Sequence, residues 1–175
     1  MLQLEGKNVL LGVSGGIAAY KSADLCRILR KHGANVRVVM TASSTQFVGE
    51  LTFQALSGNP VHSELLDSKA EAGMGHIELA KWPDLIVIAP ASANFIARYA
   101  AGFANDLLST LLLASISPVL LAPAMNQAMW LNPITQRNID QLRALFPKLE
   151  LSGPQNGEQA CGDVGPGRMT EPAVI

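Results

Sequence analysis

The sequence is short of charge, aromatic residues and cysteine, and each shortage excludes a class of protein. Charged residues make up 15% of the 175 positions, the net charge is −1, and Lys and Arg are scattered along the chain. Neither a nucleic-acid surface nor a polybasic membrane patch is therefore expected. The only cysteines, Cys26 and Cys161, cannot form a disulfide framework, and no Cys or His spacing is typical of a metal site.

Targeting and membrane-spanning segments are also missing from the pattern. Residues 1–16 lack a basic region and contain only a short apolar run, so we expect neither a signal peptide nor a transmembrane span. This pattern favours a cytoplasmic protein. Hydrophobic residues account for 49% of the chain, which disfavours disorder and allows one domain with a substantial core.

Short apolar runs alternate with segments of helical periodicity. The runs predict strands at 7–13, 35–40, 84–89, 118–122 and, at an edge, 148–151. The periodic segments predict helices at 17–31, 41–56, 76–81, 92–101, 106–115 and 135–146. This alternation predicts an α/β fold in which a parallel sheet carries helices on both faces. From Ser152 onward the chain is rich in Gly and Pro, and we expect a loop there.

Three turns that follow predicted strands carry small or polar residues. The first, VSGGIAAYK at 13–21, joins a glycine turn to a helix start, where free N–H groups and the helix dipole favour a phosphate. It is neither a GxGxxG nor a P-loop motif, and a tight turn without a ligand would also need these glycines.

The second and third turns are APASANFIA at 89–97 and APAMNQAMW at 122–130. Ligands of open parallel sheets bind at the carboxyl ends of strands, so all three turns are expected to share a pocket. The amide of Asn126 can hold a carboxylate or an amide. The plainer interpretations are that Ser92 is a helix cap and that the methionines are core residues.

Two further positions suggest chemistry. His76, in GMGHIELA, is predicted at a helix start, although a lone histidine is more often a surface or capping residue. The glycine-rich segment GEQACGDVGPGRM at 157–169 predicts a flexible flap of about residues 153–170. In it, Cys161 could donate a proton and Arg168 could pair with a carboxylate or phosphate. Cys26, on an apolar helical face, is expected in the core.

These segments together resemble a known family. SGGIAAYK, HIEL, PASAN, PAMNQAMW and ACGDVGPGRM are similar to the homo-oligomeric flavin-containing cysteine decarboxylases. The similarity spans residues 7–169 and is greatest to the members that act on 4′-phosphopantothenoylcysteine in coenzyme A biosynthesis. In many bacteria that activity is the N-terminal half of a bifunctional protein. The resemblance therefore implies a ligase domain in the full-length protein, beyond the single decarboxylase domain expected over residues 1–175.

The resemblance also implies a flavodoxin-like, Rossmann-like sheet and an FMN bound at subunit contacts within a homotrimer, which can assemble further into a dodecamer. By position, the residues expected at the FMN are Gly15, Gly16, Ile17, Ala18, Thr41, Ser43, Ser92, Ala93, Asn94, Ser109, Ala124 and Met125. The implied catalytic residues are His76, Asn126 and Cys161. The implied contacts to a small-molecule substrate are Asn126, Met129, Ala160, Cys161 and Arg168, with no metal ligand.

The implied reaction needs no external redox partner. FMN oxidises the substrate thiol to a thioaldehyde, which accepts the electrons left by the departing CO₂. The reduced flavin then reduces the resulting enethiolate, so the net redox change is zero. In this scheme His76 assists the oxidation as a base, Asn126 orients the carboxylate, and Cys161 supplies the last proton.

Three alternatives stay open. A peptidyl-cysteine decarboxylase would act on the C-terminal cysteine of a peptide, although the ACGDVGPGRM flap favours the small-metabolite enzyme. A non-catalytic flavin-binding regulatory subunit is disfavoured because His76, Asn126 and Cys161 are all present. A flavin prenyltransferase shares the fold, but the His76 and PAMN segments argue against it.

Overall fold

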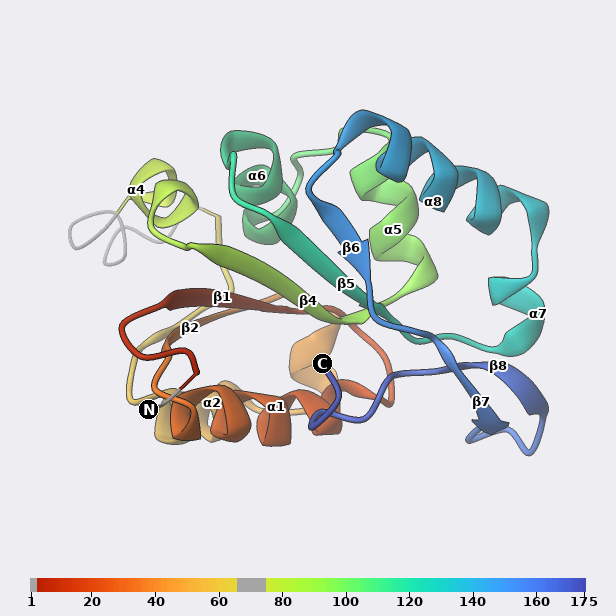
Figure 1. The fold of residues 1–175 in the computed structure, drawn as a ribbon, viewed down its shortest axis with the longest axis horizontal. Coiled ribbons are helices and arrows are strands. Elements are labelled where there is room, and N and C mark those ends of the chain that lie inside the picture. The colour runs from red at the N-terminus through yellow and green to blue at the C-terminus, as the bar shows by residue number, and fades with distance from the viewer. Residues whose placement is uncertain (1–2, 66–74) are drawn as a thin grey trace.

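The computed structural model describes residues 3–65 and 75–175 and arranges them in three layers around a central sheet (Figure 1). Its strands are all parallel, in the order β3-β2-β1-β4-β5-β6. They are β1 Asn8–Val13, β2 Asn35–Met40, β3 Val61–His62, β4 Leu85–Ala91, β5 Val119–Pro123 and β6 Leu149–Leu151. Without the two-residue β3, this is the flavodoxin-like order, in which the direction of winding reverses between β1 and β4. The predicted parallel α/β sheet is confirmed.

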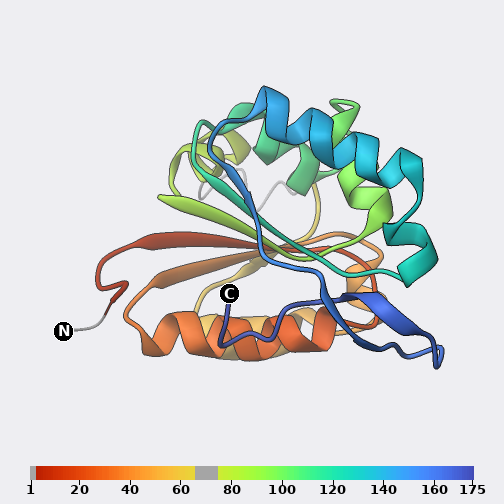
Figure 2. The same cartoon turned by 45° about the vertical axis from the view of Figure 1, so that its right-hand side comes forward.

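Helices cover both faces of this sheet (Figures 1 and 2). One face carries α1 Ala19–Lys31 and α2 Glu50–Ser57. The other carries α4 His76–Lys81, α5 Ala93–Ala100, α6 Leu107–Ala114 and α8 Pro133–Leu145. A short helix, α7 Gln127–Trp130, follows β5 at the carboxyl end of the sheet. In the described part of the chain, no helix is both long and apolar enough to cross a membrane.

The core lies in two clusters, one on each side of the sheet. Successive side chains of β1 enter opposite clusters: Leu10 packs with the α4, α5, α6 and α8 side, and Leu11 with the α1 side. Both are fully buried, which explains why β1 is a continuous apolar run and does not alternate. Cys26 of α1 is buried in the second cluster as expected, and desolvation, opposed by the charge of Arg30, raises the pKa of its thiol to about 11.

The single helix predicted at 41–56 is wrong. The structure has a 3₁₀ turn, η1 Ser44–Gln46, and then α2, which begins only at Glu50. Gly49 adopts an extended conformation and occupies the N-cap of α2, so the chain leaves the helical geometry between the two elements. The apolar periodicity continues across this break, and for that reason periodicity alone could not detect it.

The loop predicted from Ser152 onward is also wrong. Residues Gln155–Glu158 (β7) and Val164–Arg168 (β8) pair as an antiparallel hairpin with a register irregularity between Gln155 and Asn156. The hairpin lies beyond the carboxyl ends of the main strands, beside α7 (Figure 1). Gly and Pro have low strand propensity, so a strand built from VGPGR has no signal in composition.

Candidate functional site

The turns after β1 and β4 are tied together at the point where the winding reverses. Ser14, which directly follows β1, is 1% exposed. Its hydroxyl donates to the carbonyl of Pro90 at 2.6 Å and accepts from the N–H of Ser92 at 3.0 Å. Ligands of open α/β sheets bind at this switch point, at the carboxyl ends of the strands. Sequence reasoning missed the role of Ser14; its place directly after a buried strand was the available signal.

The glycine turn is closely packed at Gly15 and open at Gly16, where nothing lies within 4 Å of the Cβ position. A Cβ on Gly15 would lie 2.6 Å from the Cβ of Ser43, and the hydroxyl of Ser43 lies 3.1 Å from that of Thr41. Helix α1 begins just after this turn with no side-chain cap and no acidic residue in its first turn. The structure therefore brings together Gly15, Thr41 and Ser43 as predicted, beside a positive helix end that suits a phosphate group.

The PASAN and PAMN turns lie next to each other, as the sequence predicted. The N–H of Ala124 donates to the carbonyl of Ala91 at 3.1 Å, which joins the turn after β5 to the end of β4. The hydroxyl of Ser92 accepts from the N–H of Phe95 at 3.2 Å, so Ser92 is the N-cap of α5. Asn94 is exposed in the first turn of that helix. Both interpretations of this segment, helix cap and pocket wall, are therefore compatible with its geometry.

Ser109, by contrast, has a structural role in the described residues. Its side chain is buried and forms a reciprocal capping box with Asp106 at the start of α6. Arg98 pairs with the Asp106 carboxylate at 2.8 Å. Partial burial alone would raise the pKa of Asp106, but hydrogen bonds from Ser109 and Arg98 and the arginine charge outweigh burial and lower it. This network fixes the start of α6.

The PAMN turn and the flap meet at Asn126. Its Oδ1 accepts from the N–H of Ala128 at 2.8 Å and so caps α7. Its Nδ2 donates to the Asp163 carboxylate at 2.6 Å and lies 3.3 Å from the Cys161 Sγ. The predicted pair of Asn126 and Cys161 is therefore in contact. Asp163 is not among the residues predicted from the sequence, and its contact with Asn126 is a finding of the structure.

Backbone contacts hold the flap against α7. The N–H of Met125 donates to the carbonyl of Gly167 at 3.0 Å, and the N–H of Gln127 donates to the side chain of Gln159 at 3.0 Å. A Cβ on Gly167 would overlap the backbone carbonyl oxygen of Met125. The glycine of GPGR is thus required because the two backbones approach closely. Gln159 is a further residue that sequence reasoning missed.

The remaining predicted substrate contacts border this cluster. Met129 and Ala160 are exposed beside it. Arg168, at the end of β8, pairs with Glu171 at 3.3 Å, and Glu171 also pairs with Lys21 of α1 at 2.7 Å. The Lys21 hydrogen bond and charge lower the pKa of Glu171. These ion pairs attach the segment after the flap to α1, beside the glycine turn.

His76 lies away from the Asn126 cluster within one chain. It is the first residue of α4, as predicted, but α4 packs against α6, and its C-cap Trp82 accepts a hydrogen bond from Asn8 at the amino end of β1. Both views show α4 at the opposite end of the molecule from α7 (Figures 1 and 2). A single chain therefore does not bring His76 to Asn126 and Cys161.

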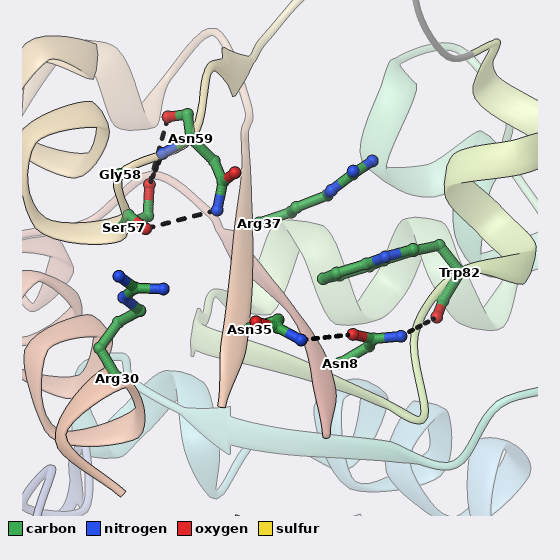
Figure 3. Close-up of a pocket in the computed structure, with 8 residues that line it drawn as sticks. All are labelled: Asn8, Arg30, Asn35, Arg37, Ser57, Gly58, Asn59 and Trp82. Carbon is green, nitrogen blue, oxygen red and sulfur yellow. Dashed lines mark hydrogen bonds between the residues drawn. The ribbon is translucent and has the colours of Figure 1, made fainter. Parts of the chain in front are cut away.

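A cavity of about 330 Å³ lies at the other, amino end of the sheet (Figure 3). It is lined by Asn8, Arg30, Asn35, Arg37, Ser57, Gly58, Asn59 and Trp82. Figure 3 shows the guanidinium groups of Arg30 and Arg37 on either side of β2, not converging on one point, and that of Arg37 lies 4.6 Å from the Trp82 ring. The asparagine amides bond to one another and to backbone carbonyls. This cavity offers no convergent ligand set.

Across residues 3–65 and 75–175, no group of three or more His, Cys, Asp and Glu side chains could hold a metal ion.

The flavodoxin-like sheet, with a glycine turn and a polar turn tied together where its winding reverses, defines the class: a doubly wound α/β protein, in which ligands commonly bind at the carboxyl ends of the strands. The family follows from comparison with known proteins. The Flavoprotein family model matches residues 2–175, and the chain belongs to this family. The sequence-based prediction of a flavin protein is confirmed.

Relatives narrow the comparison further. The chain is 60% identical over 175 residues to the coenzyme A biosynthesis bifunctional protein CoaBC of Vibrio vulnificus (strain YJ016), covering all of this chain and 43% of that protein. It is 55% identical over 174 residues to the CoaBC protein of Escherichia coli (strain K12), covering 99% of this chain and 42% of that protein. The chain thus spans less than half the length of these curated relatives.

Solved structures agree with the fold. A PPC decarboxylase mutant with serine in place of a cysteine, complexed with pantothenoylaminoethenethiol, is 36% identical with a TM-score of 0.83 and covers 97% of this chain and 93% of that one. The FMN-dependent cysteine decarboxylase SpaF is 32% identical with a TM-score of 0.81, over 98% of this chain and 95% of that one. The flavodoxin-like fold implied by the sequence resemblance is therefore confirmed.

Proposed function

We propose that this chain is an FMN-dependent carboxy-lyase. It converts 4′-phospho-N-pantothenoylcysteine to 4′-phosphopantetheine with loss of CO₂, a step of coenzyme A biosynthesis. The observation that carries the proposal is the contact of the Asn126 amide with a carboxylate at 2.6 Å and with the Cys161 thiol at 3.3 Å. An amide oriented to hold a carboxylate next to a thiol proton source is what decarboxylation of a cysteine derivative requires.

The glycine turn is the proposed site of the FMN phosphate. Gly15, Thr41 and Ser43 form a small polar cradle beside the uncapped start of α1, which fits an anionic group. The other residues proposed near the cofactor are Gly16, Ile17, Ala18, Ser92, Ala93, Asn94, Ala124 and Met125. Ser109 is left out of this set because its buried side chain is engaged in the capping box of α6. A flavin supplies, when bound, a reversible two-electron oxidation of the substrate thiol.

This assignment makes a prediction for Gly15→Ala. The added methyl group would overlap Ser43, so the cradle has to open; overpacking of this kind costs about 1–3 kcal/mol of stability. We expect FMN affinity to fall by at least about tenfold, since a lost hydrogen bond to a charged group costs about 1.5–3 kcal/mol and about 1.4 kcal/mol is a tenfold change in Kd. Fluorescence titration of the apoprotein with FMN measures this. Gly49→Ala is the matched control, because nothing lies within 4 Å of its Cβ position. Equal FMN affinity in both variants would contradict the cradle.

Substrate binding and proton transfer are assigned to the chain's own residues. Asn126 holds and orients the substrate carboxylate, and the flap that carries Cys161 closes the site and excludes water. His76 accepts a proton during oxidation of the thiol, and Cys161 donates one after CO₂ has left. The cysteine-to-serine PPC decarboxylase mutant is complexed with an ethenethiol, which lacks a carboxylate but keeps the unsaturation. That complex supports a cysteine acting after decarboxylation.

The site is proposed to be shared between subunits of a homotrimer. Within one chain, His76 belongs to α4 at the opposite end of the molecule from Asn126, so a neighbouring subunit has to supply it (Figures 1 and 2). Apolar side chains exposed around the glycine turn support a covered surface there: Ile17, Tyr20, Phe47 and Leu51 are each more than half exposed. Assembly of trimers into a dodecamer belongs to the same proposal.

The domain context and cellular compartment proposed for this chain are based on its relatives. It corresponds to less than half the length of the CoaBC proteins, which are bifunctional proteins of coenzyme A biosynthesis. We propose that the full-length protein carries a ligase domain in addition and works in the cytoplasm.

The decisive experiment combines spectroscopy and product analysis. The purified protein is reconstituted with FMN, mixed anaerobically with 4′-phosphopantothenoylcysteine, and followed for CO₂ and thiol product. Flavin absorption with CO₂ release is expected. If CO₂ instead forms only from a peptide with a C-terminal cysteine, the chain is a peptidyl-cysteine decarboxylase. If neither substrate reacts although FMN is bound, a non-catalytic flavin subunit is the better description.

A further inference from the structure

We propose that Asp163 is a specificity-determining residue that occupies the substrate's carboxylate site when no carboxylate-bearing ligand is bound. This inference rests on the proposed function and names a residue that the proposed reaction does not use. In the structure, Asp163 Oδ2 accepts from Asn126 Nδ2 at 2.6 Å, a short hydrogen bond of the charge-assisted kind, in which the acceptor is ionised. The group that would bind the substrate carboxylate is already bound to one.

Both polar atoms of the Asn126 side chain are already engaged in hydrogen bonds. Its Oδ1 is committed to the N–H of Ala128 as the cap of α7, so the orientation of the side chain is fixed. Its Nδ2 faces Asp163 and the Cys161 Sγ. These two contacts engage both N–H groups of Nδ2. A substrate carboxylate bound at Nδ2 would lie next to the Asp163 carboxylate, and because adjacent like charges repel, its binding favours departure of Asp163.

The flap does not depend on this contact for its position. Backbone N–H groups of Met125 and Gln127 hold it through Gly167 and Gln159, and Gln159 N–H donates to the backbone carbonyl of Asp163 at 2.8 Å. In the described residues, no Lys, Arg or His forms an ion pair with the Asp163 carboxylate. The side chain is therefore free to leave Asn126 while the hairpin stays docked.

Exchange of one carboxylate for another has a kinetic consequence. The substrate gains the bond to Asn126 but displaces an equivalent one, so its ground-state affinity is limited. Once substrate is bound, the nearby Asp163 charge disfavours the substrate carboxylate, and loss of neutral CO₂ relieves that repulsion. Asp163 can then return to Asn126, so that the amide is paired in the empty, the substrate-bound and the product-bound states.

Asp163→Ala tests this mechanism. We expect KM and kcat for 4′-phosphopantothenoylcysteine to fall together by about three- to tenfold, the lower part of the range for a charged hydrogen bond because the pair is solvent-exposed. The ratio kcat/KM should stay within about threefold of wild type, the pattern produced when ground-state strain is removed. Glu158→Ala is the control, since it removes an exposed carboxylate from the same hairpin. A fall in kcat/KM with KM unchanged or raised would overturn the proposal.

Binding measurements separate this proposal from the proposed function. Calorimetric titration compares 4′-phosphopantothenoylcysteine with 4′-phosphopantetheine in His76→Asn and in His76→Asn/Asp163→Ala, where turnover is blocked. The added Asp163→Ala change should tighten only the carboxylate-bearing ligand. Equal weakening of both ligands, or no change in either, contradicts the role of Asp163. The pair N-acetylcysteine and N-acetylcysteamine gives the same comparison if 4′-phosphopantothenoylcysteine is not the substrate; in that case only the proposed function fails.

Discussion

A His76→Asn variant is expected to fold and bind flavin normally but to release CO₂ about 10² to 10⁴ times more slowly than wild type, the usual loss when a positioned base is removed. Asparagine keeps polar atoms at this position but cannot accept a proton as an imidazole does near neutral pH. His76 is the first residue of α4, outside the two core clusters. The substitution should therefore leave stability nearly unchanged, and the loss should appear in kcat.

Steady-state CO₂ release and the visible flavin spectrum measure this effect. His32→Asn is the matched control, because His32 lies at the C-terminal end of α1, away from the switch point. That variant should turn over at the wild-type rate. A His76→Asn protein that retains wild-type turnover would remove His76 from the mechanism.

A mixing experiment tests whether the site is shared. His76→Asn and Asn126→Ala are each expected to be inactive alone, but co-refolded subunits should regain part of the activity. In a mixed oligomer, an intact His76 from one subunit can face an intact Asn126 from another. If every mixture stays inactive although mixed oligomers form, His76 and Asn126 act within one chain. In that case α4 would have to approach α7 by a conformational change (Figure 1).

The strands and the main helices were predictable because their physical signals are local. β1 and β4 are buried on both faces, which produces uninterrupted apolar runs in the sequence. The β7–β8 hairpin has no such signal. Its strands contain Gly and Pro, and it is held by contacts to Met125 and Gln127, which lie 42 and 32 positions before their partners Gly167 and Gln159 in the chain. Long-range docking of this kind cannot be inferred from composition.

Some residues of the candidate site were likewise predictable from the sequence, and others were not. Asn126 and Cys161 could be singled out from their segments, because an amide after a strand and a thiol in a glycine-rich segment are unusual. Asp163 could not be singled out, because its role depends on its distance from Asn126 and not on its residue type. For His76 the local structure was predictable but its place in the fold was not: the helix start follows from the sequence, whereas the separation of α4 from α7 depends on the packing of the whole chain.

Cys161→Ser is expected to release CO₂ in a single turnover and then stall. Serine is nearly isosteric with cysteine, so the hydrogen bond from Asn126 Nδ2 to the side chain at this position can be kept. A hydroxyl is, however, a far weaker acid than a thiol, whose ordinary pKa is about 8.5. Oxidation of the substrate and loss of CO₂ do not need this proton, whereas the final reduction does. Steady-state product formation should therefore fall by about 10²-fold or more.

Rapid-quench analysis separates these steps: CO₂ should appear at up to one equivalent per site, with an unsaturated thiol in place of 4′-phosphopantetheine and no return of flavin colour. Cys26→Ala is the control. Cys26 is buried in α1, and with its pKa raised to about 11 its thiol stays protonated at neutral pH, so its removal should leave each step unchanged. If Cys161→Ser yields full 4′-phosphopantetheine at the wild-type rate, another group is the acid. The Asp163 carboxyl, the other partner of Asn126, is then the first residue to test.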